Sequence, residues 1–183
     1  MALTIVIPSR ELYDEKNNEF FYINGATLRL EHSLVSISKW ESKWKKPFIS
    51  SEDKTMEETI DYVKCMTLTQ NVDDSVYRGL TNSNLKQINE YISDSMTATW
   101  FSEESKRKGR NNRIVTSELI YCWMIALNIP VEFEKWHLNR LITLIQVCNE
   151  ENNTDHKKMS KREILNRNRS INEARKAAMR TKG

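Results

Sequence analysis

The chain has 183 residues, of which 39% are hydrophobic and 29% are charged, and its formal net charge is +3. This length favours one domain with an appendage. No apolar run approaches the roughly 18–20 residues that span a bilayer, and the first eight residues lack the basic start of a secretory signal. Cys65, Cys122 and Cys148 are widely spaced and form no Cys-x-x-Cys pair. We therefore expect small buried thiols in a reducing compartment.

The positive charge is concentrated at the C-terminus. Residues 156–183 contain ten Lys or Arg and two Glu, which gives +8 and leaves about −5 for residues 1–155. A mildly acidic body thus carries a basic arm, whose partner should be acidic: nucleic acid, a membrane surface or an acidic protein face. We place the body at residues 1–152, with a hairpin in about residues 1–30, and the linker and arm at residues 153–183.

The N-terminal segment has the pattern of a β-hairpin. Leu3–Ile7 alternates with β-branched residues and stops at Pro8, and Glu19–Asn24 is aromatic and β-prone. We expect these two strands to pair in antiparallel fashion across a polar loop, Ser9–Asn18, with Thr27–Leu30 as a candidate third strand. A lone hairpin is marginal in water, so it should pack on another element.

The pattern becomes helical at Ser33. The first helix should end before Pro47, and four apolar side chains share one of its faces. They are Leu34, Ile37, Trp40 and Trp44. A capping box at Thr55–Glu58 predicts the start of a second helix.

A short helical turn should follow at Asp73–Gly79, and then a helix capped by Asn82 or Ser83. Ser93–Arg113 is polar and contains the basic cluster Lys106–Arg110. It is expected to be a surface loop, with a brief strand possible at Met96–Phe101.

The most apolar helix is predicted at Glu118–Leu127, starting from Thr116 or Ser117. Apolar residues on nearly every side of it indicate a central, buried helix. Pro130 should open a further helix, which presents residues from Phe133 to Cys148 and ends near Asn152.

A capping box at Ser160–Glu163 predicts a helix in the arm. The fold class is therefore mainly α, a helical domain with an N-terminal β-hairpin and a basic C-terminal helical arm.

Catalytic and metal-binding signatures are absent from the sequence. Glu134 and His137 match half of a di-iron Glu-x-x-His motif, but neither of the other histidines, His32 and His156, has a Glu three positions earlier. A partly buried His137 beside a helix interface is the simpler interpretation. The chain has no glycine-rich phosphate loop and no nucleophile elbow. The sequence therefore predicts no enzyme, no cofactor and no metal site.

The tryptophan pair Trp40 and Trp44 permits three interpretations. Aromatic residues four apart on an amphipathic helix are typical of a core, but they can form a ligand platform. An exposed pair would mark an interface anchor. We therefore keep both residues as candidate partner-binding residues.

The basic arm also permits three interpretations: a solvated tail, docking on an acidic protein groove, and nucleic-acid contact. Residues 156–183 contain no Phe, Tyr or Trp to stack on a base, so contacts to nucleic acid would be mostly to phosphate and sensitive to salt. The candidate binding residues are Lys157, Lys158, Lys161, Arg162, Arg167, Arg169, Arg175 and Lys176.

Stretches along nearly the whole chain resemble a protein of tailed-phage and prophage tail gene clusters. The matching stretches are Leu30–Trp44 with Lys46-Pro-Phe48, Met66–Asn71, Met96–Thr99, Thr116–Tyr121, Trp123–Pro130, Lys135–Leu141, Met159–Ile164 and Asn172–Arg175. The chain looks like the small proteins encoded near the tape-measure gene of long-tailed phages, a position typical of tail assembly chaperones.

This resemblance implies a non-enzymatic assembly factor in the host cytoplasm. Such a chaperone coats the apolar, helical tape-measure protein until tail-tube subunits polymerise around it, and it is then absent from the mature virion. The implied partners are the tape-measure protein or other tail proteins, and no membrane is expected as a partner. The resemblance leaves a homo-oligomer as a further possibility. The alternatives are a minor structural protein of the tail or neck, and a nucleic-acid-binding regulator that uses the basic arm.

Overall fold

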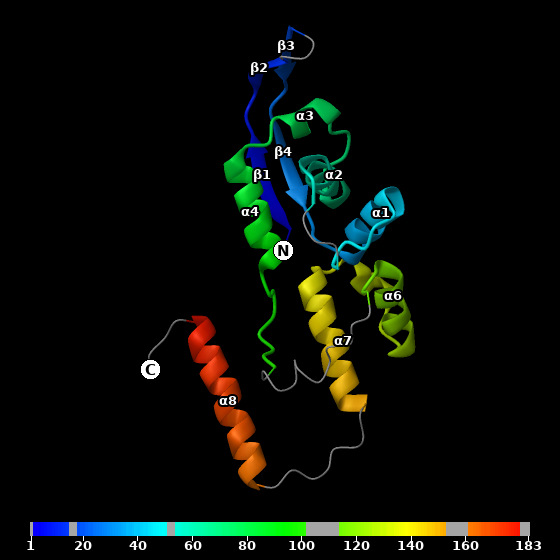
Figure 1. The fold of residues 1–183 in the computed structure, drawn as a ribbon, viewed down its shortest axis with the longest axis vertical. Helices are drawn as coiled ribbons and strands as arrows, with labels where there is room; N and C mark the ends of the chain where they lie inside the picture. The colour runs from blue at the N-terminus through cyan, green and yellow to red at the C-terminus, as the bar shows by residue number, and fades with distance from the viewer. Residues whose placement is uncertain (1, 15–17, 51–53, 102–113, 153–160, 180–183) are drawn as a thin grey trace. The chain divides into compact units, whose positions relative to one another are not determined.

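The computed structural model describes residues 2–14, 18–50, 54–101, 114–152 and 161–179. The chain divides into two compact units, Met1–Met96 with Ile114–Ile142, and Thr97–Arg113 with Thr143–Gly183. The fold is mainly α with an N-terminal hairpin, which confirms the predicted class (Figure 1). Among the helices that the structure describes, none combines the length and the apolar character that crossing a bilayer requires.

The first unit begins with one long, interrupted hairpin. Strand β1 (Leu3–Ile7) pairs with β4 (Ala26–Leu30), and β2 (Arg10–Asp14) pairs with β3 (Glu19–Ile23), both in antiparallel register. The expected pairing of β1 with the aromatic strand is therefore wrong. Residues 10–14, which we expected in a loop, form a strand whose register runs from Arg10 opposite Ile23 to Asp14 opposite Glu19.

A close backbone approach at Gly25 separates the two ladders of the hairpin. The N–H of Gly25 donates to Ser9 Oγ at 2.8 Å. A Cβ on Gly25 would lie 2.8 Å from both the backbone N and the Oγ of Ser9. A side chain at position 25 would therefore clash with Ser9, which favours glycine there. On the opposite strand, Pro8 interrupts the ladder at the corresponding position.

The remaining edge of β4 is covered by the chain that follows the second helix. Leu68 N donates to Arg29 O at 2.7 Å, and Glu31 N donates to Met66 O at 2.9 Å. These bonds satisfy backbone groups that an open edge would leave unpaired.

The helices of the first unit start at side-chain caps. Helix α1 (Leu34–Trp44) starts at Ser33, and α2 (Met56–Met66) starts at Thr55, whose predicted capping box with Glu58 is confirmed. After α3 (Asp74–Arg78), α4 (Asn82–Ser93) is capped by Thr81, one residue before the positions we expected.

The second half of the first unit contains α6 (Ser117–Ala126), the 3₁₀ helix η1 (Val131–Lys135) and the start of α7 (Leu138–Asn152). The single helix expected after Pro130 is thus divided, because Trp136 has an extended backbone with ψ 160°. The strand expected at residues 96–101 does not form.

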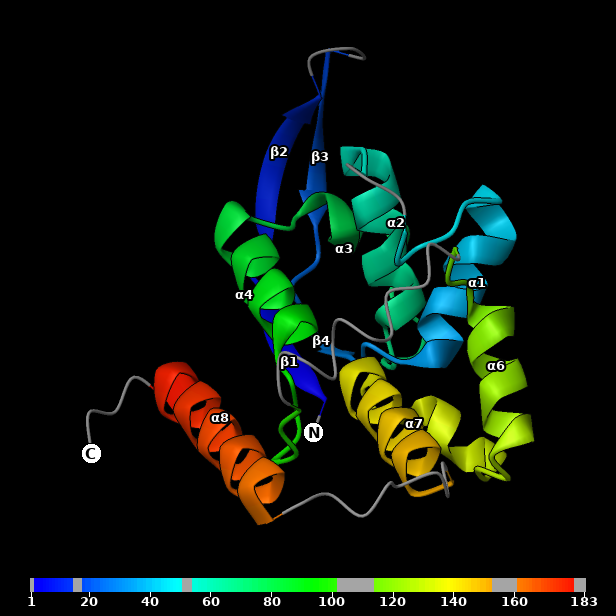
Figure 2. The ribbon, with the colours of Figure 1, turned by 60° about the horizontal axis from the view of Figure 1, so that its bottom comes forward.

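The second unit contains the later turns of α7 and the arm helix α8 (Lys161–Met179). Figure 2 shows both helices in full length. The predicted arm helix is confirmed. Its proposed cap Ser160 and the basic cluster Lys106–Arg110 lie outside the described residues.

The core of the first unit lies between the β1–β4 ladder and the helices. Side chains from β1, β4, α1, α2, α6 and α7 are fully or almost fully buried there. They include Ile5, Ile7, Leu28, Leu30, Leu34, Ile37, Trp40, Val63, Met66, Ile120 and Leu141.

Gly25→Ala should destabilise the fold by about 1–3 kcal/mol, since the new methyl group would overlap the backbone of Ser9. Chemical denaturation measures this change as a lower midpoint. Asn24→Ala, at the exposed neighbouring position, is the matched control. Equal stability of the two variants would contradict the steric argument.

Candidate functional site

Three carboxylates are buried around α1 and α2, and hydrogen bonds occupy all of them. Asp61 accepts from Lys43 Nζ at 2.5 Å and from Trp44 Nε1 at 2.8 Å. Glu58 accepts from Lys46 Nζ at 2.5 Å and from Thr55 N at 2.8 Å.

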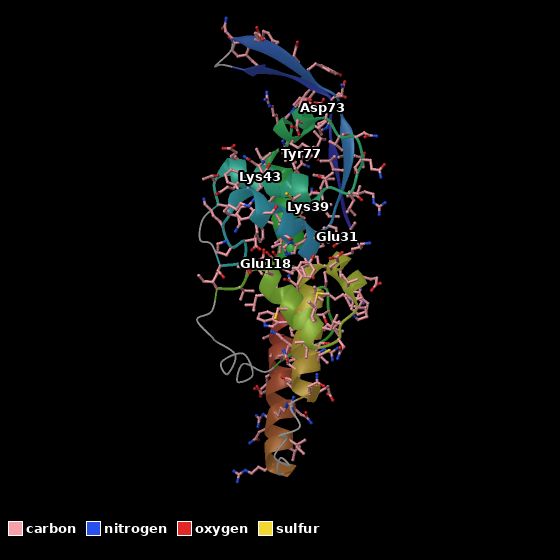
Figure 3. All side chains as sticks on the ribbon, turned by 90° about the vertical axis from the view of Figure 1, so that its right-hand side faces the viewer. Glu31, Lys39, Lys43, Asp73, Tyr77 and Glu118 are labelled. Carbon is pink, nitrogen blue, oxygen red and sulfur yellow. The ribbon has the colours of Figure 1, made fainter. Side chains whose placement is uncertain are left out.

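The third carboxylate, Glu41, joins segments that are far apart in the sequence. Its Oε1 accepts from Phe48 N at 2.7 Å and its Oε2 accepts from Ser117 N at 2.8 Å. The second bond satisfies a backbone N–H at the start of α6, where no side-chain cap is present. Figure 3 labels Lys43 on α1 and Glu118 beside this junction.

These bonds make the carboxylates structural groups rather than acid–base catalysts. The hydrogen bond from Lys46 holds the pKa of Glu58 below its usual value. Glu58 is therefore ionised at neutral pH and already paired.

A second cluster contains two histidines and two tyrosines. His32 Nδ1 and the Tyr62 hydroxyl share a hydrogen bond of 2.5 Å, and the rings of His32 and His137 lie 5.0 Å apart. The Tyr91 hydroxyl donates to Glu31 at 2.6 Å. Both histidines are buried, which confirms the simpler interpretation of His137.

The hydrogen bonds of His137 define its neutral form. Its Nε2 donates to the carbonyl of Tyr91 at 3.0 Å, and its Nδ1 accepts from Asn139 N at 3.3 Å. Burial lowers the pKa of His137. Burial and the neighbouring His137 lower the pKa of His32 to about 3. Both rings are therefore neutral at pH 7 and contribute packing and hydrogen bonds.

The described residues contain no group of three or more His, Cys, Asp or Glu side chains that could hold a metal ion. Two surface depressions each run along a single helix. One follows α4 from Asn82 to Ser93, and another follows α8 from Leu165 to Lys176. Neither brings together side chains from different elements, as substrate sites usually do.

Trp40 belongs to the core and is not an exposed anchor. Its side chain is fully buried, and its Nε1 donates to Glu58 O at 2.9 Å. Trp44 is half-buried, stacks on Trp40 at 6.2 Å and carries Lys43 over its ring. Only Trp44 retains surface for a partner.

Helix α6 is not the central, buried helix that we expected. Its inner face is anchored by Ser117, Ile120 and Met124, which are buried. The opposite stripe contains Cys122 and Ile125, and the Ile125 side chain is 77% exposed. The expectation that Cys122 is buried is therefore wrong as well.

The surface at the end of α6 is also apolar. Ala126 follows Ile125 on the exposed stripe, and Val131 of η1 is exposed. We call Cys122, Ile125, Ala126 and Val131 the α6 surface. Exposed apolar side chains that gather on one helix face are typical of a protein-binding site.

A second apolar surface lies on the hairpin end, which extends beyond α3 (Figures 1 and 3). Tyr13 is opposite Phe20 in the ladder, and their rings lie 4.9 Å apart. Tyr22 shares this face because it is two residues from Phe20. All three are exposed, and Phe20 reaches 69%. An Arg10 Nη2 bond to Gly79 O, 2.7 Å long, fixes the base of this ribbon.

The structure describes only part of the candidate residues of the arm. Lys157 and Lys158 lie outside the described residues, and Lys161 is the first residue of α8. The side chains of Arg162, Arg169, Arg175 and Lys176 are exposed on α8. Arg167 lies 3.7 Å from Glu150, so part of its charge is balanced by α7.

Comparison with protein-family models, with curated proteins and with solved structures found no significant match to this chain.

The sequence did not lead us to predict the α6 surface or the exposed aromatic face of the β2–β3 hairpin. We call this face, formed by Tyr13, Phe20 and Tyr22, the aromatic ribbon. The signal for the first was present, since a helix with apolar residues on both faces needs two partners, and the described residues of the body cover only one face. The signal for the second was Tyr13, an aromatic residue of high β-propensity in the segment that we expected to be a loop.

Glu41→Gln should destabilise the first unit by about 1–3 kcal/mol. The amide NH₂ cannot accept a hydrogen bond, so either Phe48 N or Ser117 N loses its partner. Denaturation midpoints measure the loss, with Glu132→Gln on exposed η1 as the control. An unchanged midpoint for Glu41→Gln would show that water replaces the bond.

Acidification should destabilise the fold through His32. The unfolded state binds a proton below the ordinary pKa of 6.5, whereas the folded state binds it only near pH 3. Stability is therefore full above pH 6.5 and falls as the pH drops, by about 2 kcal/mol at pH 5.

The comparison of wild type with His32→Asn isolates this effect, because the carboxylates contribute equally to both proteins. The stability difference between the two should shrink by about 2 kcal/mol from pH 7.5 to pH 5. NMR of the His32 ring provides a second measurement that needs no variant. A ring that is protonated at pH 5 in the folded protein would contradict the prediction.

Proposed function

We propose that this chain is a phage tail assembly chaperone, or a closely related morphogenesis factor, that binds the tape-measure protein through protein–protein contacts. The observation that carries the binding role is the uncovered α6 surface, with Ile125 at 77% exposure. The identity of the client rests on the sequence resemblance to proteins of phage tail gene clusters. The proposal places the chain in the host cytoplasm and outside the mature virion.

The chemistry of α6 suits a helical client. Cys122, Ile125 and Ala126 recur at the spacing of one helical stripe, and Val131 continues the apolar area. A second amphipathic helix can cover such a stripe with its own apolar residues at i, i+3, i+4 and i+7. Burying one side chain of the size of Ile125 contributes about 1.5–3 kcal/mol.

The size of this surface also suits a temporary complex. A few apolar side chains provide a modest gain, much of which offsets the freedom lost on association. The client would bind along its length through many weak copies of this contact and would be released when tube subunits displace them. No step of this role needs a catalytic group.

The test is co-expression with the tape-measure protein encoded in the same gene cluster, followed by purification through a tag on this chain. Wild type should keep the client soluble and co-purify with it. Ile125→Asp should lower the recovered client by at least ~10-fold, because a charged group cannot enter an apolar contact.

Two further variants locate the contact. Met56→Asp changes another exposed apolar residue, in the first turn of α2, where an acidic group is compatible with the helix dipole. This variant should bind like wild type. Phe20→Asp tests the aromatic ribbon. Loss of client with Phe20→Asp but not with Ile125→Asp would move the contact to the hairpin.

Cross-linking gives independent evidence. A benzophenone attached to Cys122, with Cys65 and Cys148 replaced by serine, should capture the client if the α6 surface binds it. Failure of all variants and wild type to retain the client, with this chain present in purified particles, would support a structural tail or neck protein instead.

A further inference from the structure

The arm helix α8 has one face that the proposed client contact does not use. Arg162, Arg169 and Lys176 recur every seven residues, so they form one stripe with steps of about 10 Å along the helix. All three side chains are exposed. We call these three residues the basic stripe.

We propose that the basic stripe of α8 binds a nucleic-acid duplex by contacting its phosphates. Lys161–Met179 contains six Lys or Arg and two Glu, which gives the helix a net charge of +4. A polyanion is the partner with the complementary charge. An α-helix also has the width that the major groove of DNA admits.

The side chains beside the stripe favour nucleic acid over an acidic protein. Asn168 and Asn172 line the same shallow depression as Arg169 and Lys176. Amide side chains commonly bond phosphates and base edges. A protein contact would need large apolar anchors at its centre, and Leu165 is the apolar residue that lines this depression.

A duplex fits this helix better than a single strand does. Proteins that hold single strands stack the bases on aromatic rings. Residues 156–183 contain no Phe, Tyr or Trp. Contacts from the basic stripe would therefore reach the phosphates of a stacked duplex and show little preference for sequence.

An acidic residue on the same face weakens this contact. Glu173 Oε1 accepts from Arg169 Nε at 3.0 Å, and Glu173 lines the depression together with Arg169. The carboxylate both holds the guanidinium and repels an approaching phosphate. Replacing Glu173 by Gln should therefore strengthen binding, an effect that a merely solvated helix would not show.

The experiment measures fluorescence anisotropy of a labelled 20-base-pair DNA duplex with the full chain between 50 and 200 mM salt. Affinity should fall with salt, and three phosphate contacts correspond to a log–log slope of about −3. Arg169→Ala with Lys176→Ala should reduce the size of the slope by about 2. Glu173→Gln should raise the affinity about 2- to 5-fold.

The matched controls lie on α4 and η1 of the first unit, and α4 has the same kind of exposed pair. Lys86 and Glu90 are also four residues apart, with Nζ and Oε1 separated by 4.0 Å. Lys86→Ala combined with Lys135→Ala removes two charges from the other unit and should leave the salt slope unchanged. Glu90→Gln should leave the affinity unchanged.

Three results would overturn the proposal. The first is no measurable binding at 50 mM salt. The second is a change in salt slope or affinity with the Lys86, Lys135 and Glu90 control variants that equals the change with the α8 variants. The third is displacement of the duplex by polyglutamate at an equal concentration of charge, which would identify an acidic polypeptide as the partner. Since the α8 variants leave the α6 surface intact, the client test and the duplex test can fail separately.

Discussion

The buried carboxylate of Glu41 is the interaction on which the arrangement of the first unit depends. It accepts from Phe48 N and from Ser117 N, and so connects α1 to the loop after it and to the start of α6. A charged acceptor suits this place because the N-terminus of a helix carries unsatisfied N–H groups and partial positive charge. The bond orients α6, with Ile120 and Met124 toward the core. The stripe of Ile125 must then face outward.

The parts of the fold that depend on local chemistry could be predicted from the sequence. Thr55 caps α2 as expected, because a capping box is a contact between residues three apart. The end of α1 near Pro47 and the short helix before Gly79 follow from the same kind of local rule. The class of the fold was accessible for this reason.

The pairing of strands that are far apart in the sequence was harder to predict. Strand β1 had two possible partners of similar character, the aromatic strand and Ala26–Leu30, and the choice depends on whether residues 10–14 form a strand of their own. The pairing is determined by burial along the whole hairpin, because the observed register places both Ile23 and Leu28 in the core. Periodicity describes one segment at a time, so it does not contain this competition.

Helix α6 shows the same limit at the candidate site. Its sequence is apolar on both faces, and such a pattern is common to a helix buried inside a domain and to a helix whose second face binds another protein. The burial of Trp40 shows the opposite case, since its spacing with Trp44 was typical of a core but also compatible with a surface platform. In both cases the deciding fact is which neighbours the rest of the chain brings, and for α6 the described part of the body brings neighbours to one face only.

The two proposed contacts differ in physical character. Burial of the α6 surface is driven by removing apolar area from water, which salt does not weaken. A contact between the basic stripe of α8 and phosphates depends on the release of counterions and weakens steeply as salt increases. The surfaces also lie in different compact units of the chain. Ionic strength should therefore shift one contact while leaving the other in place, so a single protein could retain its client while its arm exchanges between anionic sites.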